Sequence, residues 1–265
     1  MDRKILALDL DGTAVDDSGK LGSLSKQALI AARQKGHILC FVTGRRDVDM
    51  VPLGEDDRFA DYLILNNGGK IISTADGRIL KNELVDKEEA KILISYCLQK
   101  DYLLYILSGM YWAINKITPR TQSYIEELGI QPDLYHSLAD VEYDRIEGFT
   151  VTSDGKEVSA FLDRADLNLE YVASEPTCID IMKKGVNKWN GLKALADSLA
   201  IPVAQTIAVG NYDNDIDMLT HAGIGIAVQN ALPDVKAAAD YVTLKDNNHD
   251  AVAEIVEKFM ISPSS

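Results

Sequence analysis

Short apolar runs alternate with helical patterns near both ends of the chain. The apolar runs lie at residues 4–8, 37–42, 62–65, 206–209 and 224–228. Continuous apolar runs of this length are typical of strands that are buried on both faces, and strands that alternate with helices indicate parallel βαβ units. We therefore expect an α/β fold whose core is a parallel sheet.

Helical patterns connect these runs. Ser25 is a typical N-cap residue and Gly36 is a typical residue beyond a helix C-terminus, so we expect a helix between them. Further helices are expected at residues 187–200, from about residue 213, and at about 251–259. With the apolar runs, they give the regular alternation that a doubly covered parallel sheet requires.

The pattern changes in the middle of the chain, where strand patterns follow one another. Asp86 begins a helix with capping-box spacing, and Thr118 followed by Pro119 begins another helix that ends at Gly129. Strand patterns lie at 102–107, 111–114, 146–152, 169–173 and 178–182. We expect a Rossmann-like core formed by residues 1–84 and 185–265, interrupted by an α+β domain at residues 85–184.

The net charge argues against two classes of partner. Lys and Arg together number 27 against 41 Asp and Glu, which gives a formal charge of −14. Nucleic acids and anionic membranes are bound by concentrated basic patches, so we expect neither as a partner. No apolar run approaches the ~20 residues that a membrane-spanning helix needs. A small anionic substrate is still allowed, because a few local cations could bind it.

The three cysteines, Cys40, Cys97 and Cys178, are scattered and form no C-x-x-C pair. They are too few for a disulfide framework, and we interpret them as buried thiols in a reducing compartment. The strand pattern begins at residue 4 and leaves no room for a signal peptide. We therefore expect a cytoplasmic protein. Monomer and dimer both agree with the sequence.

Polar residues directly follow two of the predicted core strands. Asp9 and Asp11 come after the first apolar run, and Asn211 and Asp215 come after a later one. The carboxyl ends of parallel strands share one edge of a sheet, so these side chains should converge there together with Thr43. Carboxylate and amide oxygens are ligands of hard cations, and Mg²⁺ is typically held by one or two carboxylates plus substrate phosphate. We expect a Mg²⁺ and phosphate site at this edge.

Four short motifs occur in order along the chain, namely DLDGT at 9–13, VTGR at 42–45, GVNK at 185–188 and GNYDND at 210–215. This ordered set resembles the motifs of the haloacid dehalogenase-like superfamily. The NG pair at 67–68 and the AGIGIA stretch at 222–227 are similar to its Cof-type branch. The resemblance covers the whole chain and implies a phosphatase whose inserted domain is a type IIB α+β cap.

The resemblance implies a role for each motif residue. Asp9 would attack phosphorus and form an aspartyl phosphate, and Asp11 would protonate the leaving alcohol and then activate water. Thr43, Gly44 and Lys188 would bind the phosphoryl group. Two carboxylates in different surroundings can divide these roles, because a nucleophile and an acid need opposite protonation states.

The same resemblance implies that Mg²⁺ is bound by Asp9, the backbone carbonyl of Asp11, Asn211 and Asp215. Asn211 departs from the family pattern, in which Asp is usual. An amide keeps an oxygen ligand but loses a negative charge, so we expect weaker Mg²⁺ binding with retained turnover. Trp189 is a second departure, since a small residue commonly stands at this position.

We expect Arg45, Asn67 and Asn214 to contact the substrate. The expected function is Mg²⁺-dependent hydrolysis of small phosphorylated metabolites, with sugar phosphates foremost. Two alternatives stay open: a phosphomutase, if a second hydroxyl replaces water as the acceptor, and a phosphometabolite sensor, if Asn211 marks a site without turnover. A dehalogenase is disfavoured because it needs no Mg²⁺, which would leave the fourth motif unexplained.

Overall fold

The computed structural model describes residues 3–152, 155–175 and 177–261. The chain divides into two compact units. Unit 1 is built from Met1–Gly44, Pro52–Lys81 and Asn187–Ser265, and unit 2 is built from Arg45–Val51 and Asn82–Val186. The short segment Arg45–Val51 groups with the inserted part of the chain, whereas the sequence pattern assigns it to the core.

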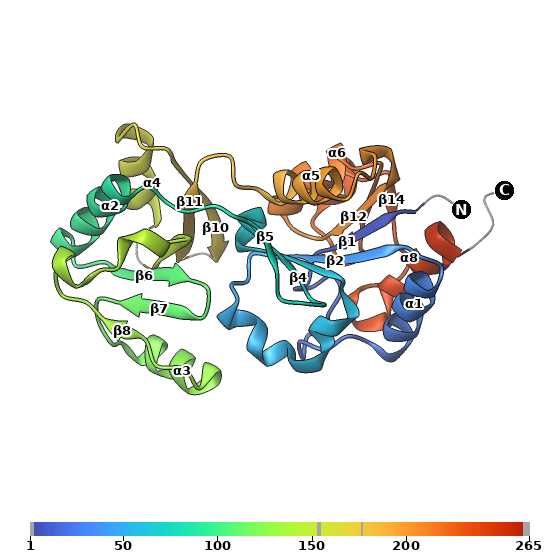
Figure 1. The fold of residues 1–265 in the computed structure, drawn as a ribbon, viewed down its shortest axis with the longest axis horizontal. Coiled ribbons are helices and arrows are strands. Elements are labelled where there is room, and N and C mark those ends of the chain that lie inside the picture. Colours follow the sequence, from blue (N-terminus) through green and yellow to red (C-terminus); the bar gives the residue numbers. More distant parts are fainter. Residues whose placement is uncertain (1–2, 153–154, 176, 262–265) are drawn as a thin grey trace. The chain divides into compact units, whose positions relative to one another are not determined.

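Unit 1 is built on one sheet with β1 (Ile5–Leu8) near its centre (Figure 1). β1 pairs in parallel with β12 (Thr206–Gly210) and with β2 (Ile38–Val42). The sheet order is β14-β13-β12-β1-β2-β3-β4-β5, and its other strands are β3 (Tyr62–Leu65), β4 (Lys70–Ser73), β5 (Ile79–Asn82), β13 (Ile224–Ala227) and β14 (Tyr241–Val242). The strands from β14 to β3 are all parallel, which confirms the expected α/β fold.

Helices cover both faces of this sheet, which explains why every residue of β1, β2 and β12 is buried. Figure 1 shows α5 (Lys188–Ser198) and α6 (Ile216–His221) on one face, with α1 (Ser23–Gln34) and α8 (Ala251–Val256) on the other. The other helical segments are η1 (Val48–Phe59), whose first residues group with unit 2, and η2 (Asn66–Gly68), η5 (Val203–Gln205), η6 (Asp213–Asp215), α7 (Pro233–Ala238), η7 (Asn247–His249) and η8 (Glu257–Ile261).

Unit 2 contains a second sheet with the order β10-β11-β9-β6-β7-β8. Its strands are β6 (Leu103–Ser108), β7 (Tyr111–Ile114), β8 (Asp133–Leu134), β9 (Gly148–Thr152), β10 (Leu169–Glu175) and β11 (Cys178–Lys183). α2 (Lys87–Gln99) and α4 (Gly155–Arg164) share one hydrophobic cluster with the sheet, and α3 (Pro119–Leu128) shares another. Two short turns are η3 (Leu138–Asp140) and η4 (Tyr143–Arg145). Successive strand residues divide between the two clusters, so α3 lies on the face opposite α2 and α4.

Two helices of unit 2, α2 and α3, begin at the N-cap residues that the sequence predicts. Asp86 accepts hydrogen bonds from the backbone N–H groups of Glu88 and Glu89 at the start of α2. Thr118 forms a capping box at the start of α3, and Gly129 ends this helix in the left-handed conformation with φ of 65°. These contacts satisfy backbone groups that the helix ends leave unpaired.

The predicted N-cap Ser25 is wrong. The N-cap of α1 is Gly22, three residues before the predicted one, and Ser25 lies inside the helix and is buried. The Asp250 side chain, which is distant in sequence, accepts a hydrogen bond from the backbone N–H of Ser25 (N···O 2.8 Å). It thereby satisfies a donor of the first helical turn that a local N-cap side chain would otherwise satisfy. A Cβ on Gly22 would lie 2.1 Å from Asp250 Oδ1, so the close approach of this carboxylate requires glycine.

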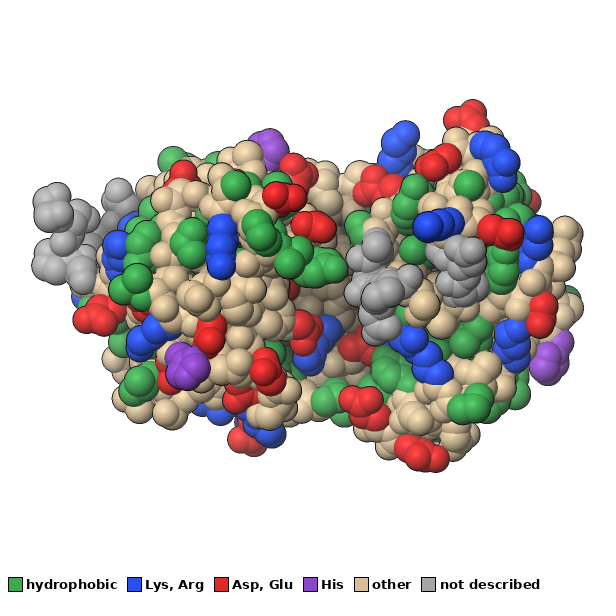
Figure 2. All heavy atoms as spheres, turned by 180° about the vertical axis from the view of Figure 1, so that it is seen from behind, with side chains coloured by type: hydrophobic (Ala, Val, Ile, Leu, Met, Phe, Trp, Pro, Cys, Tyr) green, Lys and Arg blue, Asp and Glu red, His purple; other side chains and the backbone are tan. Residues whose placement is uncertain are grey.

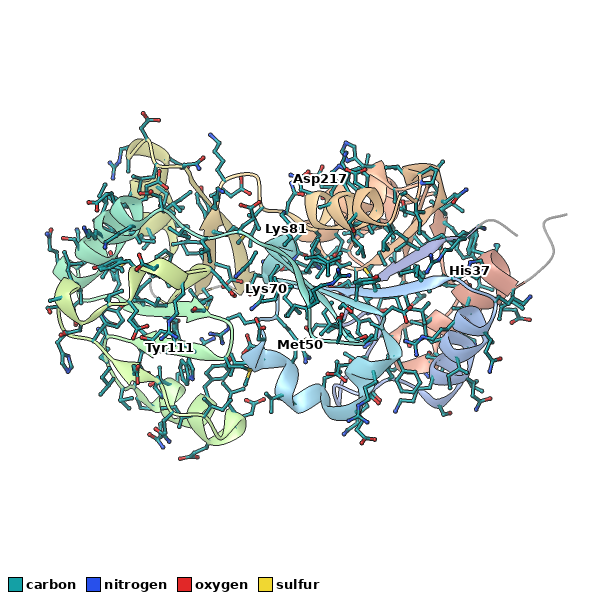
Figure 3. All side chains as sticks on the ribbon, in the orientation of Figure 1. His37, Met50, Lys70, Lys81, Tyr111 and Asp217 are labelled. Atoms are coloured by element: carbon teal, nitrogen blue, oxygen red, sulfur yellow. The ribbon has the colours of Figure 1, made fainter. Side chains whose placement is uncertain are left out.

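A buried histidine ties the C-terminal segment to the sheet. His37 precedes β2 (labelled in Figure 3), and its Nδ1 accepts from the N–H of Lys4 (3.2 Å). The other nitrogen, Nε2, therefore carries the hydrogen and donates to the carbonyl of Met260 (3.2 Å). Burial lowers the pKa of His37, so the ring is neutral at neutral pH. These bonds lie at the opposite strand ends from the acidic residues.

The surface mixes both signs of charge. On the face drawn in Figure 2, Lys and Arg side chains are interspersed with Asp and Glu side chains.

Within the described ranges, no helix has both the length and the apolar character needed to cross a membrane. The three cysteines are buried and free, as the sequence indicates.

Two glycines allow α5 to approach the loop after β3. A Cβ on Gly191 would lie 2.7 Å from the Cα of Gly68, and a Cβ on Gly68 would lie 2.1 Å from the carbonyl oxygen of Asn187. Gly68 also has a φ of 101°, which favours glycine. This contact fixes the N-terminus of α5, the end that carries Lys188.

We predict that Gly68→Ala destabilises the protein by about 3 kcal/mol or more, because it combines backbone strain with the clash against Asn187. Gly36→Ala is the matched control, since Gly36 also has a positive φ of 86° but has no atom within 4 Å of an added Cβ. We expect it to cost only about 1 kcal/mol. Urea unfolding followed by circular dichroism measures both; equal losses would contradict the packing role.

Candidate active site

The carboxyl ends of β1 and β12 place two carboxylates at one edge of the sheet. Asp9 directly follows β1, and its backbone N–H donates to the carbonyl of Val209 in β12 (3.0 Å). Asp215 lies in η6, which follows β12. Asp9 is 5% exposed and Asp215 is 0% exposed. Both carboxylates are thus shielded from water, so each needs a partner.

Lys188 supplies that partner for both carboxylates. It is the first residue of α5, and its Nζ donates to Asp9 Oδ1 (2.8 Å) and to Asp215 Oδ1 (2.6 Å). The lysine side chain is itself only 2% exposed. Buried charges are tolerated where each is paired and hydrogen-bonded. One ammonium therefore links the first, third and fourth motifs.

The surroundings of Asp9 and Lys188 shift the pKa values of both side chains. Burial, together with the nearby Asp215 carboxylate, raises the pKa of Asp9 to about 7, although Lys188 opposes the shift. Burial alone would lower the pKa of Lys188, but the Asp215 and Asp9 carboxylates outweigh it and raise that pKa. Lys188 is therefore charged at neutral pH. The ionised form of Asp9 depends on the positive charge beside it.

Backbone donors and a glycine orient Asp215. Its Oδ2 accepts from the N–H groups of Asn211 (2.9 Å) and Tyr212 (3.1 Å). A Cβ on Gly210 would lie 2.4 Å from Asp215 Cγ, so the glycine lets the carboxylate approach the strand end. A Cβ on Gly12 would likewise lie 2.4 Å from Asn211 Nδ2. The Asn211 side chain thus lies against the first motif.

The second motif meets the loop after β3. The N–H of Thr43, a buried residue, donates to the carbonyl of Ile64 (2.9 Å), and its own carbonyl accepts from the N–H of Asn67 (3.0 Å). Asn67 has a φ of 52° and is buried, and its Oδ1 accepts from Asn214 Nδ2 (3.2 Å). A Cβ on Gly44 would lie 3.2 Å from that same oxygen. The structure therefore brings Thr43, Gly44, Asn67 and Asn214 together.

Two of the predicted site residues, Asp11 and Arg45, differ from the others in exposure or in the unit to which they belong. Asp11 is exposed at the start of the turn that follows Asp9. Arg45 belongs to unit 2, where its Nη1 donates to the carbonyl of Asp49 (3.3 Å). The other predicted site residues all lie in unit 1. Unit 1 thus carries both carboxylates, the lysine and the motif loops.

The donors available for a metal ion are few but suitable. Across residues 3–152, 155–175 and 177–261, no group of three or more His, Cys, Asp or Glu is arranged to hold a metal. The candidate donors are two carboxylates, Asp9 and Asp215, with the amide of Asn211 and the carbonyl of Asp11. Mg²⁺ prefers oxygen, keeps several waters and often uses only one or two carboxylates. The donor set therefore fits Mg²⁺ whose remaining ligands are water and phosphate oxygens.

Sequence reasoning missed Asn230. This residue comes shortly after β13, and its Nδ2 donates to the carbonyl of Gly12 (2.8 Å). Gly12 adopts a φ of 70°, which glycine tolerates without strain, and Asn230 thus helps to hold the turn that contains Asp11. The rule that selected Asp9, which favours polar residues after core strands, applies equally to β13 and could have found Asn230.

Trp189 has a packing role within unit 1. Its ring stacks on the ring of His221 in α6, with 5.3 Å between centroids and 21° between planes. Asn187, which caps α5, donates from Nδ2 to Asp217 Oδ2 (3.3 Å). These contacts join the N-terminus of α5 to α6 beside Lys188.

Comparisons with known proteins extend over nearly the whole chain. The family model of haloacid dehalogenase-like hydrolases matches residues 6–256. Phosphatase YwpJ of Bacillus subtilis is 28% identical, over 93% of this chain and 96% of its own. Another Bacillus subtilis protein, 5-amino-6-(5-phospho-D-ribitylamino)uracil phosphatase YcsE, is 26% identical, over 98% of this chain and 97% of its own.

Solved structures show the same fold. The subclass IIB sugar phosphatase BT4131 has a TM-score of 0.82 at 25% identity, covering 97% of this chain and 98% of that one. A haloacid dehalogenase-like hydrolase from Bacteroides thetaiotaomicron has a TM-score of 0.86 at 24% identity, covering 97% and 99%, and is alike in fold. The family and its relatives support a phosphoric monoester hydrolase. The resemblance seen in the motifs is confirmed: the chain belongs to the haloacid dehalogenase-like hydrolases.

Proposed function

We propose that this chain is a Mg²⁺-dependent phosphatase that hydrolyses small phosphorylated metabolites through an aspartyl phosphate at Asp9. The observation that carries the proposal is the buried group of Asp9, Asp215 and Lys188 at the carboxyl edge of the sheet. A buried carboxylate beside a second carboxylate and a fixed ammonium suits a nucleophile that receives a phosphoryl group. Its location in the cytoplasm is part of the proposal, since the three described cysteines are free thiols.

In the first step, a carboxylate oxygen of Asp9 attacks phosphorus. Lys188 already binds Oδ1, so we assign Oδ2 as the attacking oxygen. The bond between phosphorus and the substrate oxygen breaks, and Asp11 gives its proton to that oxygen, which leaves as an alcohol. The Thr43 hydroxyl and the Gly44 N–H would donate to the phosphoryl oxygens and stabilise their charge.

In the second step, water releases the phosphate. Asp11, now ionised, removes a proton from a water molecule while the water oxygen attacks phosphorus. The bond from phosphorus to Asp9 Oδ2 breaks, which restores the carboxylate and frees inorganic phosphate. Asp11 is exposed whereas Asp9 is buried, and this difference in surroundings allows the two carboxyl groups to play different roles.

Asp9, Asp215, Asn211 and the carbonyl of Asp11 would hold Mg²⁺. When bound, the ion supplies positive charge for the phosphoryl oxygens. The pKa of Asp9, raised to about 7 by burial and by Asp215, gives a second reason for a cation, because attack requires the carboxylate form.

The substrate class is proposed from the relatives. YcsE is named for a substrate with a phosphoribityl group, and BT4131 is named as a sugar phosphatase. Phosphorylated sugars and sugar alcohols share this chemistry, and we assign the same class to this chain. Residues 85–184 would be the cap that selects the leaving group, and Arg45, Asn67 and Asn214 would contact the substrate.

The amide side chain of Asn211 supports one alternative function. A neutral amide near the metal reduces the attraction for a divalent cation, so a chain that binds phosphometabolites without turnover would act as a sensor. The presence of both Asp9 and Asp11 counts against it, because binding alone needs neither a nucleophile nor an acid. Turnover separates the two candidates.

We predict that Asp9→Asn lowers phosphate release by at least about 10³-fold, because the amide cannot attack phosphorus. The assay is Mg²⁺-dependent release of inorganic phosphate from a panel of sugar and sugar-alcohol phosphates. Asp144→Asn, an exposed position in unit 2, is the control and should keep full activity. No turnover of any substrate by the natural chain, with tight binding of one of them, would favour the sensor.

We predict that Asn211→Asp raises Mg²⁺ affinity by about tenfold, because it adds a full negative charge to the donor set. Isothermal titration calorimetry measures the affinity directly, and the Mg²⁺ concentration for half-maximal activity should fall in parallel. Asn168→Asp makes the same charge change at an exposed site in unit 2. An equal gain in both variants would show a general charge effect and remove Asn211 from the metal site.

We predict that stability in the presence of EDTA depends on pH through Asp9. Its folded pKa of about 7 lies above the ordinary value of 3.8, so the native state binds the extra proton between these values. The free energy of unfolding should therefore fall as pH rises from 4 to 7, by on the order of 3 kcal/mol from this group. Asp9→Asn should lack this part of the slope. Parallel pH profiles for the two proteins would contradict the shift.

A further inference from the structure

The turn that carries Asp11 is folded on itself. The N–H groups of Thr13 and Val15 both donate to the carbonyl of Leu10 (3.1 Å each), and Asp11 forms a parallel β-bridge with Val15. Val15 is 1% exposed, whereas Asp11 is exposed. The backbone of Asp11 is therefore joined to a buried residue, while Asp11 itself stays accessible from the solvent.

Asn247 binds this turn from the C-terminal part of unit 1. It begins η7 and is 7% exposed, and its Nδ2 donates to the carbonyl of Val15 and to Asp17 Oδ1 (3.1 Å each). Both partners are acceptors, so the nitrogen of the amide must face them, and each contact takes one of its two hydrogens. A buried carbonyl that loses its donor is costly. Asn247 thus fixes the residue that pairs with Asp11.

A second asparagine extends this support to Gly12. The backbone N–H of Asn247 donates to Asn230 Oδ1 (3.2 Å), and Nδ2 of Asn230 donates to the carbonyl of Gly12 (2.8 Å). Gly12 follows Asp11 directly, and Val15 pairs with it. The two asparagines therefore hold the backbone of Asp11 through both of these neighbours.

A third asparagine completes the network. Asn248 accepts at Oδ1 from the N–H of Asp17 (3.0 Å), and its Nδ2 donates to Asn247 Oδ1 (3.4 Å). The nitrogen and the oxygen of the Asn247 side chain thus both have partners. An aspartate at position 247 could accept hydrogen bonds but could not donate to Val15, so the contact requires an amide.

We propose that Asn247, acting with Asn230, is a positioning residue for Asp11. The inference rests on the proposed function, in which Asp11 protonates the leaving oxygen and later takes a proton from water. Both transfers need the carboxyl group within hydrogen-bond reach of the reacting oxygen, and a small displacement costs much of the rate. The asparagines supply the rigidity that an exposed side chain on a turn lacks.

This role makes the loss of rate depend on the leaving group. The alcohol of a sugar phosphate takes up a proton as its bond to phosphorus breaks, whereas acetate leaves acetyl phosphate as a stable anion and needs no proton. A displaced Asp11 should therefore slow the first step with a sugar phosphate far more than with acetyl phosphate. A general structural defect would slow both alike.

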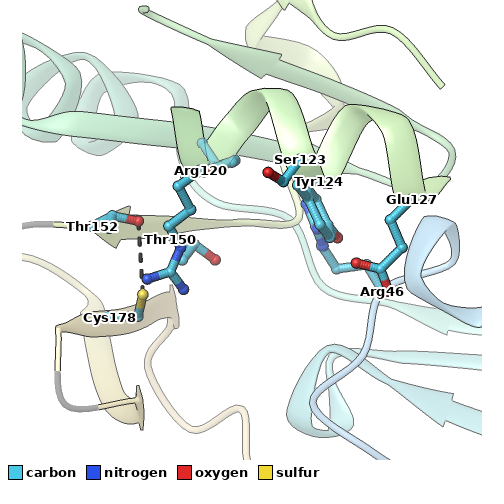
Figure 4. Close-up of a pocket in the computed structure, with 9 residues that line it drawn as sticks. Arg46, Arg120, Ser123, Tyr124, Glu127, Thr150, Thr152 and Cys178 are labelled. Carbon is cyan, nitrogen blue, oxygen red and sulfur yellow. Dashed lines mark hydrogen bonds between the residues drawn. The ribbon is translucent and has the colours of Figure 1, made fainter. Parts of the chain in front are cut away.

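The proposed cap is a separate influence on the leaving group. The recess drawn in Figure 4 is lined by residues of unit 2, among them Arg120, Tyr124 and Thr150. The three asparagines belong to unit 1. Their substitution leaves the residues that line this recess unchanged, so a new preference between leaving groups reports on Asp11.

The test measures the first step by rapid quench, as alcohol or acetate released in a single turnover at saturating Mg²⁺. The two substrates are acetyl phosphate and the sugar or sugar-alcohol phosphate that the natural chain hydrolyses fastest. Asn247→Leu should slow the sugar phosphate by about tenfold or more and acetyl phosphate by less than about twofold. Asn230→Leu should act in the same direction, and it changes an exposed residue if the buried substitution prevents folding.

Thr206→Val is the matched control. Thr206 is buried, and its Oγ1 donates to the carbonyl of Val203 (2.7 Å) and accepts from the N–H of Gly223 (3.1 Å). It begins β12, at the opposite strand end from Asp9 and Asp215. Its substitution removes two buried contacts and should leave the ratio of the two rates unchanged. Equal slowing of both substrates by Asn247→Leu, or the same change of ratio in Thr206→Val, would contradict the inference.

Hydrogen exchange lets the inference and the proposed function fail separately. In EDTA and without substrate, residues 10–21 should exchange about tenfold faster in Asn247→Leu than in the natural chain, but not in Thr206→Val. Turnover by the natural chain with unchanged exchange in Asn247→Leu would overturn the inference and keep the phosphatase. No turnover by the natural chain would remove the phosphatase and the catalytic role of Asp11 together, while faster exchange would still show that Asn247 holds the turn.

Discussion

The bridge from Lys188 to Asp9 and Asp215 is the interaction on which the candidate site depends. Two buried carboxylates repel each other, and removing one partner of a buried ion pair costs about 3–5 kcal/mol. The fold meets this constraint by joining three elements, since Asp9 follows β1, Asp215 follows the adjacent β12, and Lys188 begins α5. The contact of Gly68 with α5 then holds the ammonium in place.

The same arrangement explains how similar side chains can differ in chemistry. Asp9 is buried and its pKa is raised, whereas Asp11 lies in water on a turn held by Asn230. The neutral Asn211 leaves Asp9 and Asp215 as the carboxylates among the proposed ligands, which is sufficient for an ion that keeps water and takes phosphate oxygens.

Sequence patterns predict those features of this protein that follow from general rules on short stretches of sequence. The parallel core, the cap of α3 at Thr118 and the gathering of Asp9 with Asp215 follow from period, capping and strand ends. The patterns missed α4, β4 and β5, which are short or lie between strands, and misplaced the start of α1. Contacts between distant residues decide these cases, as when Asp250 replaces Ser25 as the cap of α1. The pairing of Arg46 with Asp49 and Tyr124 is likewise visible only in three dimensions.

The most direct test of a covalent role for Asp9 is to trap the phosphorylated protein. The Asp11→Asn variant, which lacks the base that activates water, is mixed with phosphorus-radiolabelled acetyl phosphate and Mg²⁺ and quenched in acid. Peptide mapping then locates the label. A label on the peptide that contains Asp9, absent from the Asp9→Asn protein, is the predicted result. A label on another residue, or no label while the natural chain still releases phosphate, would contradict it.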